Sequence, residues 1–171
     1  MNVTVREERP EDNIHVFVIN NEAFGGAEEA DLVERLRKST SSAPGLSLVA
    51  EAKGKVIGHI LFSKCQIIAE DESWEALVLA PVAVTPILHG RGIGGKLIQE
   101  GLKKAKALGY GAVIVLGEAD YYPRFGFEKA SKWEVKCPFE VPDECFMAQE
   151  LKPGYLEGKA GTVRYPIEFQ I

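Results

Sequence analysis

The sequence predicts an α/β fold built on a mixed sheet, and three observations lead to that prediction. Strand-like segments stand on both sides of an amphipathic helical pattern at residues 94–108. A glycine-rich connection precedes this helix, and the apolar run Ala112–Leu116 follows it. A strand, a crossover helix and a buried strand in this order are typical of a parallel pair within an α/β sheet.

Composition and charge exclude several classes of partner and of binding site. The 171 residues, 46% hydrophobic and 26% charged, predict one globular domain over residues 1–171. The net charge of −5 disfavours nucleic acid as a partner, and no apolar run is long enough for a membrane span. The charged N-terminal residues lack the apolar stretch of a signal peptide, so we expect a cytoplasmic protein. Three cysteines without a CxxC pair and three scattered histidines predict neither a disulfide framework nor a metal site.

The other elements follow from periodicity and turn residues. Val3–Glu7 alternate as a strand, and Pro10 begins a helix whose apolar stripe runs to Phe24 and stops at Gly25 and Gly26. That stripe consists of Ile14, Phe17 and Val18. The elements expected next are a helix over Glu28–Lys38, a loop over Ser39–Gly45, strands over Leu46–Lys53, Lys55–Ile68 and Ala76–Val84 with a hairpin at Gly54, the amphipathic helix ending at Gly109, and short strands after Lys132.

The connection before the amphipathic helix is the most informative segment. Four glycines within six residues let backbone N–H groups crowd around an anion, and the helix N-terminus adds partial positive charge. The surrounding residues 89–106 carry five cations against one anion, in an otherwise acidic chain. We therefore expect a phosphate or diphosphate ligand. The segment reads His89, Gly90, Arg91, Gly92, Ile93, Gly94, Gly95 and Lys96.

Two phosphate-binding motifs fit this segment poorly. The P-loop pattern GxxxxGK[ST] matches Gly90, Gly95 and Lys96, but Leu97 stands where a Mg²⁺-binding hydroxyl is needed. The dinucleotide pattern GxGxxG matches three glycines, and Glu118 could serve as the ribose ligand. However, its first glycine should follow the strand at once, and the C-terminal third shows almost no helical periodicity.

The same segment resembles motif A of the GNAT superfamily of N-acetyltransferases, (Q/R)-x-x-G-x-(G/A), with His89 in place of the usual Gln or Arg. Residues 82–84 stand where the family's fourth strand lies. Residues 122–127 resemble its Y-x-x-x-G-F segment, and the chain is most like the bacterial YhbS-like subfamily over nearly its whole length. The resemblance implies the element order β-α-α-β-β-β-α-β-α-β, helices on both faces of the sheet, and strands four and five splayed apart.

The resemblance also implies roles for individual residues. The loop from His89 to Gly95 would hold the diphosphate of coenzyme A. Val82, Ala83 and Val84 would bind the pantetheine arm, with the Val82 N–H directed at the thioester oxygen. Pro81 cannot donate to a sheet ladder, which favours unpaired N–H groups near Val82. Tyr122 occupies the general-acid position, Arg124 is a candidate for a cofactor phosphate, and Glu22 lies where the family builds its acceptor pocket. The general base stays open among Glu22, Glu118, His59 and a water relay.

The function expected from this resemblance is direct transfer of an acetyl group from acetyl-CoA to a primary amine in a ternary complex, without a metal. The acceptor is a small molecule, a peptide or a protein amine, and the protein is a monomer or homodimer. Two alternatives stay open: a non-catalytic acyl-CoA sensor, and a dinucleotide-dependent oxidoreductase.

Overall fold

The computed structural model describes all residues, 1–171, and contains one mixed sheet of nine strands with three α-helices. By backbone contacts the chain divides into two compact units, the first formed by residues 1–63 and 80–104, the second by residues 64–79 and 105–171. The strands β3 and β4 each contribute residues to both units. No helix is long and apolar enough to cross a bilayer.

The first unit combines three helices with antiparallel strands. Its β1–β2 ladder pairs Thr4 with Glu51 through Glu7 with Leu48, and β2 pairs in turn with β3. Its elements are β1 (Thr4–Glu7), α1 (Asn13–Phe24), α2 (Glu28–Arg37), β2 (Ser42–Ala52), the first part of β3 (Lys55–Ile68), the last part of β4 (Ser73–Val84) and most of α3 (Ile93–Ala107).

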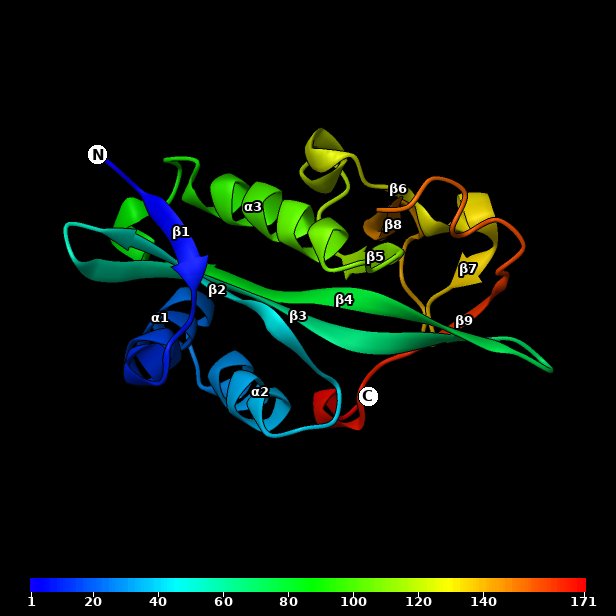
Figure 1. Cartoon of the computed structure of the whole chain (residues 1–171), viewed down its shortest axis with the longest axis horizontal. Helices are drawn as coiled ribbons and strands as arrows, with labels where there is room; N and C mark the ends of the chain where they lie inside the picture. Colours follow the sequence, from blue (N-terminus) through cyan, green and yellow to red (C-terminus); the bar gives the residue numbers. More distant parts are fainter. The chain divides into compact units, whose positions relative to one another are not determined.

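Within this unit, helices cover both faces of the sheet, as expected (Figure 1). Alternation along β3 shows which helix lies on which face. A Cβ on Gly58 would be 3.0 Å from Leu97 of α3. The next residue, His59, points to the opposite face, where its ring lies 3.3 Å from the side-chain nitrogen of Asn20 in α1. The close approach of α3 to the sheet positions the glycine-rich segment at its N-terminus.

The buried face of α1 differs from the expected stripe. Ile14 and Val18 are 69% and 45% exposed, whereas Val16, Ile19 and Asn20 are buried. The prediction was wrong because periodicity counts only apolar residues. The buried face includes a polar side chain whose partner, on β3, is far away in the sequence. The end of the helix is as expected, since Gly25 adopts the left-handed conformation (φ +67°) and its N–H reaches the carbonyl of Asn21.

Two strands start earlier than expected. β2 begins at Ser42, inside the expected loop, and its pairing with β3 shifts register between Ser42 and Ser47. β4 begins at Ser73 rather than Ala76. The hairpin at Gly54 is confirmed: Lys53 and Gly54 both have positive φ, +51° and +75°.

The second unit holds the remaining strands. β5 (Ala112–Leu116) pairs in parallel with β4, as predicted, and pairs antiparallel with β8 (Phe146–Glu150) along its whole length. The short strands β6 (Glu128–Lys129), β7 (Val135–Lys136) and β9 (Gly161–Arg164) complete it. The helix expected after the fifth strand is absent. A single 3-10 turn, Tyr122–Phe125, takes its place because Gly126 ends it in the left-handed conformation after four residues.

Candidate functional site

The connection between β4 and α3 carries a run of unpaired backbone amides. Gly90 and Gly92 have φ of +78° and +77°, a conformation that favours glycine. The first helical hydrogen bond of α3 runs from the N–H of Lys96 to the carbonyl of Gly92. None of the six amides of residues 90–95 donates a hydrogen bond within the chain. Six free donors at a helix N-terminus form a favourable site for a phosphate anion.

Side chains around this loop either anchor it or leave it accessible. Ile93 is buried and fixes the first turn of α3, whereas Gly94 and Gly95 add no side chain over their amides. Arg91 is exposed and has no partner in the structure. Lys96 is engaged, because its Nζ donates to the carbonyl of Val3 at 2.6 Å. The cation next to the free amides is therefore Arg91.

The end of β4 offers amides at its free edge. The N–H of Thr85 donates to the carbonyl of Ile57 in β3. Because successive residues of a strand alternate, the N–H of Ala83 points toward β3 as well, and those of Val82 and Val84 point to the opposite edge. The ladder between β4 and β5 ends at the pair Val78–Ile114. The amides of Val82 and Val84 thus lie beyond that ladder.

The role expected for Pro81 stays a prediction. Pro81 has no N–H to donate to a neighbouring strand. Val82 and Val84 lie past the last pair of the β4–β5 ladder. Whether the two strands splay apart beyond Val78 stays a prediction.

His89 joins this strand edge to the glycine loop. Its Nε2 lies 2.8 Å from the carbonyl oxygen of Val84, although the ring is exposed. The carbonyl and N–H of a strand residue point to the same edge, so the ring bonds to β4 on the edge away from β3. The residue that departs from the family motif therefore holds the loop against the strand.

Of the three side chains considered as general base, His59 is ruled out by its surroundings. It is 0% exposed, with Nδ1 near Asn20 and Nε2 2.9 Å from the hydroxyl of Ser47. Burial, and then the nearby charge of Arg37, lowers its pKa from 6.5 to about 3. Ser47 in turn donates to Glu8 at 2.6 Å. His59 thus belongs to a buried polar network, which the sequence does not reveal because its members come from four separate segments of the chain.

The acidic candidates are exposed. Glu22 lies in the last turns of α1 in the first unit, and Glu118 follows β5 in the second unit. Neither side chain has a hydrogen-bond or ion-pair partner in the structure. Each therefore stays a candidate on position alone.

Tyr122 and Arg124 belong to the second unit. The Tyr122 ring makes edge contacts with Tyr121 and Phe127, at centroid distances of 5.1 and 5.8 Å. Burial, then the neighbouring Tyr121 and Glu118, raises its pKa from 10 to about 12. Its hydroxyl has no hydrogen-bond partner within the chain. Arg124 is exposed, lies 5.7 Å from the Tyr121 ring and donates to the carbonyl of Asp120.

The structure brings one group of expected residues together. Within the first unit, His89 links the strand residues to the loop of free amides. Sequence reasoning missed the contact of Gly117 with the Tyr122 ring in the second unit. A lone glycine after a strand carries no signal that could have indicated it.

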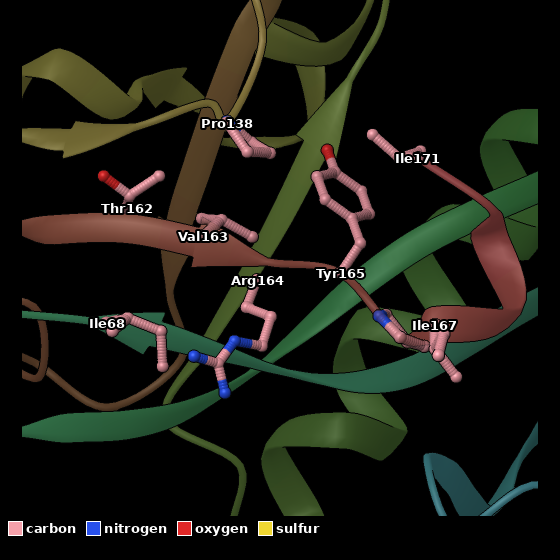
Figure 2. Close-up of a pocket in the computed structure, with 9 residues that line it drawn as sticks. Ile68, Pro138, Thr162, Val163, Arg164, Tyr165, Ile167 and Ile171 are labelled. Atoms are coloured by element: carbon pink, nitrogen blue, oxygen red, sulfur yellow. The ribbon is translucent and has the colours of Figure 1, made fainter.

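The second unit also contains a cavity of about 310 Å³, shown in Figure 2. Its walls are mostly apolar and come from the end of β3, β9 and the residues after β9. The side chains of Tyr165 and Arg164 extend to opposite sides of the chain at this point (Figure 2). The Tyr165 hydroxyl is buried without a hydrogen-bond partner. No group of three or more His, Cys, Asp or Glu side chains is arranged to hold a metal ion.

Comparison with known proteins shows to which family the chain belongs. The model of the acetyltransferase (GNAT) domain matches residues 4–130. The chain belongs to the GNAT family of acetyltransferases. Within this GNAT domain, the matched region contains both the loop of free amides and the Tyr122 turn.

Individual relatives agree with this membership. The chain is 42% identical over 137 residues to the N-acetyltransferase YjhQ of Escherichia coli, covering 78% of this chain and 76% of YjhQ. It is 33% identical over 165 residues to the N-acetyltransferase YhbS of the same species, covering 96% and 97%. The crystal structure of YhbS in complex with CoA superposes with a TM-score of 0.91, covering 100% of this GNAT chain and 93% of that one. A GNAT acetyltransferase from Brucella melitensis in complex with acetyl-CoA is 33% identical, with a TM-score of 0.79 and 98% of both chains covered.

Proposed function

We propose that this protein transfers an acetyl group from acetyl-CoA to a primary amine by direct attack in a ternary complex. The observation that carries the proposal is the run of six unpaired amides at residues 90–95, at the N-terminus of α3. A diphosphate is the part of coenzyme A that such a site fits. The solved relatives support this choice of donor, since YhbS was crystallised with CoA and the Brucella protein with acetyl-CoA.

The end of β4 and the loop of residues 90–95 would each bind a different part of the cofactor. The loop amides neutralise the diphosphate, with Arg91 as a nearby cation. Val82, Ala83 and Val84 present a strand edge to the amide groups of the pantetheine arm. The acetyl thioester supplies an activated carbonyl. The N–H of Val82 stabilises negative charge on the carbonyl oxygen in the transition state, an effect worth about 3–4 kcal/mol per donor in other enzymes.

Two protons must move during the transfer. The attacking amine must be neutral, and a lysine-like amine has a pKa near 10.4. The departing thiolate takes up a proton, for which we propose Tyr122 as the donor. This role rests on the position of Tyr122 in the Tyr-Pro-Arg-Phe-Gly-Phe motif. A phenol is protonated at neutral pH even at its ordinary pKa of 10, and the raised pKa of about 12 makes Tyr122 a weaker acid than an exposed tyrosine.

Glu22 would contribute to the acceptor pocket and Arg124 would contact a phosphate of the cofactor. Both residues are exposed and free of ion pairs, so each is available to a ligand. The proton of the amine would leave through Glu22, Glu118 or a water relay.

The decisive experiment measures free thiol release from acetyl-CoA with a panel of amines. Tyr122→Phe is expected to lower kcat by at least tenfold while the CoA dissociation constant changes less than twofold. Tyr110→Phe, which changes a half-buried tyrosine of the same unit, is the matched control and should keep full activity. Saturable CoA binding without turnover of any amine would contradict catalysis and indicate a sensor. Binding of NAD without CoA would contradict the choice of donor.

A further inference from the structure

Gly117, the first residue after β5, lies directly against the ring of Tyr122. A Cβ built on Gly117 would be 2.9 Å from Cδ2 of Tyr122 and closer still to Cε2. The φ of Gly117 is not positive, so its backbone does not require glycine. The ring of Tyr122 is what excludes a side chain at this position.

The backbone of Gly117, against which the Tyr122 ring packs, is held in place by the sheet. The N–H of Gly117 donates to the carbonyl of Cys145 at 2.9 Å, next to the last pair of the β5–β8 ladder, Leu116–Phe146. The backbone of Gly117 therefore cannot easily move away from an inserted methyl group. The ring would have to move instead.

The turn that carries Tyr122 is fixed from β8 as well. Nε2 of Gln149 donates to the carbonyl of Phe125, the last residue of the 3-10 turn, at 2.7 Å. Gly126 closes the turn at φ +97°, and a Cβ there would be 3.0 Å from the same Nε2. The ring is thus packed by Gly117, Tyr121 and Phe127, whereas its hydroxyl has no partner within the chain.

We propose that Gly117 and Gln149 are positioning residues that set the position and direction of the Tyr122 hydroxyl. The proposal rests on the acid role given to Tyr122 above. An ordinary carbon contact is longer than 3.4 Å, so a methyl group at residue 117 displaces the ring by roughly 1 Å. A displacement of that size can cost about a hundredfold in rate.

The chain offers a matched control for Gly117→Ala. Gly111 immediately precedes β5, as Gly117 follows it, and its Cβ would meet the ring of Tyr155 at equally short distances. The Tyr155 hydroxyl donates to the carbonyl of Glu75, so this second ring has a structural role. Gly111→Ala therefore inserts the same methyl group against the same kind of ring in the same unit.

The test is a double-mutant cycle with kcat and the CoA dissociation constant as readouts. Gly117→Ala is expected to lower kcat by about 10- to 100-fold with a less than twofold change in CoA binding. In the Tyr122→Phe background, Gly117→Ala should change kcat less than twofold. Gly111→Ala should lower the melting temperature but keep kcat. If Gly117→Ala does not fold, Gln149→Leu, which removes the hydrogen bond to Phe125 at similar size, carries the same cycle.

Three results would overturn the proposal. The first is an equal loss of kcat from Gly117→Ala with and without the Tyr122 hydroxyl. The second is a loss from Gly111→Ala as large as that from Gly117→Ala. The third is an unchanged tyrosine titration: ring displacement should expose Tyr122 and lower its pKa, which a ¹³C label on the phenol carbon reports without turnover. If Tyr122→Phe keeps full activity while this titration shifts, the acid role fails and the packing role of Gly117 stands.

Discussion

The imidazole of His89 bonds to the backbone carbonyl of Val84 at 2.8 Å, and so joins the start of the glycine loop to the end of β4. The two segments expected to hold the diphosphate and the pantetheine arm are thereby held together by one side chain. A ligand that contacts both segments benefits from this bond, because less ordering is left to be done on binding.

Replacing His89 should therefore weaken cofactor binding more than it weakens the fold. His89→Ala removes one hydrogen bond on an exposed ring, worth about 1 kcal/mol, so the CoA dissociation constant should rise about fivefold. His89→Gln places an amide N–H in similar reach and should restore most of the affinity. Isothermal titration calorimetry measures both. Equal losses for the two variants would show that the bond to Val84 is not what matters.

The left-handed glycines of the loop should be needed for affinity. A Cβ at Gly90 or Gly92 meets no atom within 4 Å, so alanine there causes backbone strain without a clash. That strain is about 1–2 kcal/mol, and relaxing it reorients the amides of the loop. CoA affinity should fall about tenfold.

The control for the loop glycines is Gly109→Ala. Gly109 has φ +93° and equally open space, but it follows the C-terminal end of α3. The variant should lose a similar amount of stability, measured by urea unfolding, with CoA affinity unchanged. A parallel loss of affinity in Gly109→Ala would mean that backbone strain next to either end of α3 is sufficient.

The buried network around His59 should make the fold sensitive to acid. The pKa of His59 is about 3 in the native state, against 6.5 for an exposed histidine. Between these pH values the unfolded chain binds a proton that the native chain does not. The contribution of His59 to stability is therefore complete above pH 6.5, and it falls by about 1.4 kcal/mol per pH unit as the pH drops toward 3.

Chemical denaturation from pH 7 to pH 4 measures this slope. In His59→Gln, the side-chain amide can accept a hydrogen bond from Asn20 and donate one to Ser47. The slope of stability against pH should fall by the contribution of about one proton. The comparison variant is His15→Gln, at an exposed histidine outside this network. An unchanged slope in His59→Gln would place the acid sensitivity elsewhere, for instance in the ion pair of Arg6 with Asp12.

Local chemistry explains why the sequence predicts some elements well. The turns at Gly25, Gly54 and the loop glycines need a positive φ, which glycine adopts readily. A glycine can be recognised in any short stretch of sequence. The parallel β4–β5 pair follows from a crossover helix between two apolar strands. Motif A likewise depends on neighbouring amides, so the sequence alone is enough to place it.

The failed predictions depend on contacts between distant residues. The buried face of α1 is decided by Asn20 meeting His59, 39 residues away. The 3-10 turn that replaces the helix expected after β5 is ended by Gly126 and is also bonded by Gln149 from β8. The contact of Gly117 with Tyr122 is a third case, since a glycine without positive φ has no local signature. Periodicity cannot register any of these contacts.

Two tyrosines of the second unit should respond in opposite directions to loss of the hydroxyl. The Tyr165 hydroxyl beside the cavity in Figure 2 is buried without a partner, and the ring packs on Phe169 at 5.3 Å. The Tyr155 hydroxyl donates to the carbonyl of Glu75 at 2.6 Å. An unsatisfied buried hydroxyl costs about 1–3 kcal/mol, whereas a formed hydrogen bond contributes about 1 kcal/mol. Tyr165→Phe should thus keep or raise the free energy of unfolding, and Tyr155→Phe should lower it by about 1 kcal/mol. Urea unfolding distinguishes the two, and a clear loss of stability in Tyr165→Phe would mean that the hydroxyl has a partner in solution, such as a bound water in the cavity.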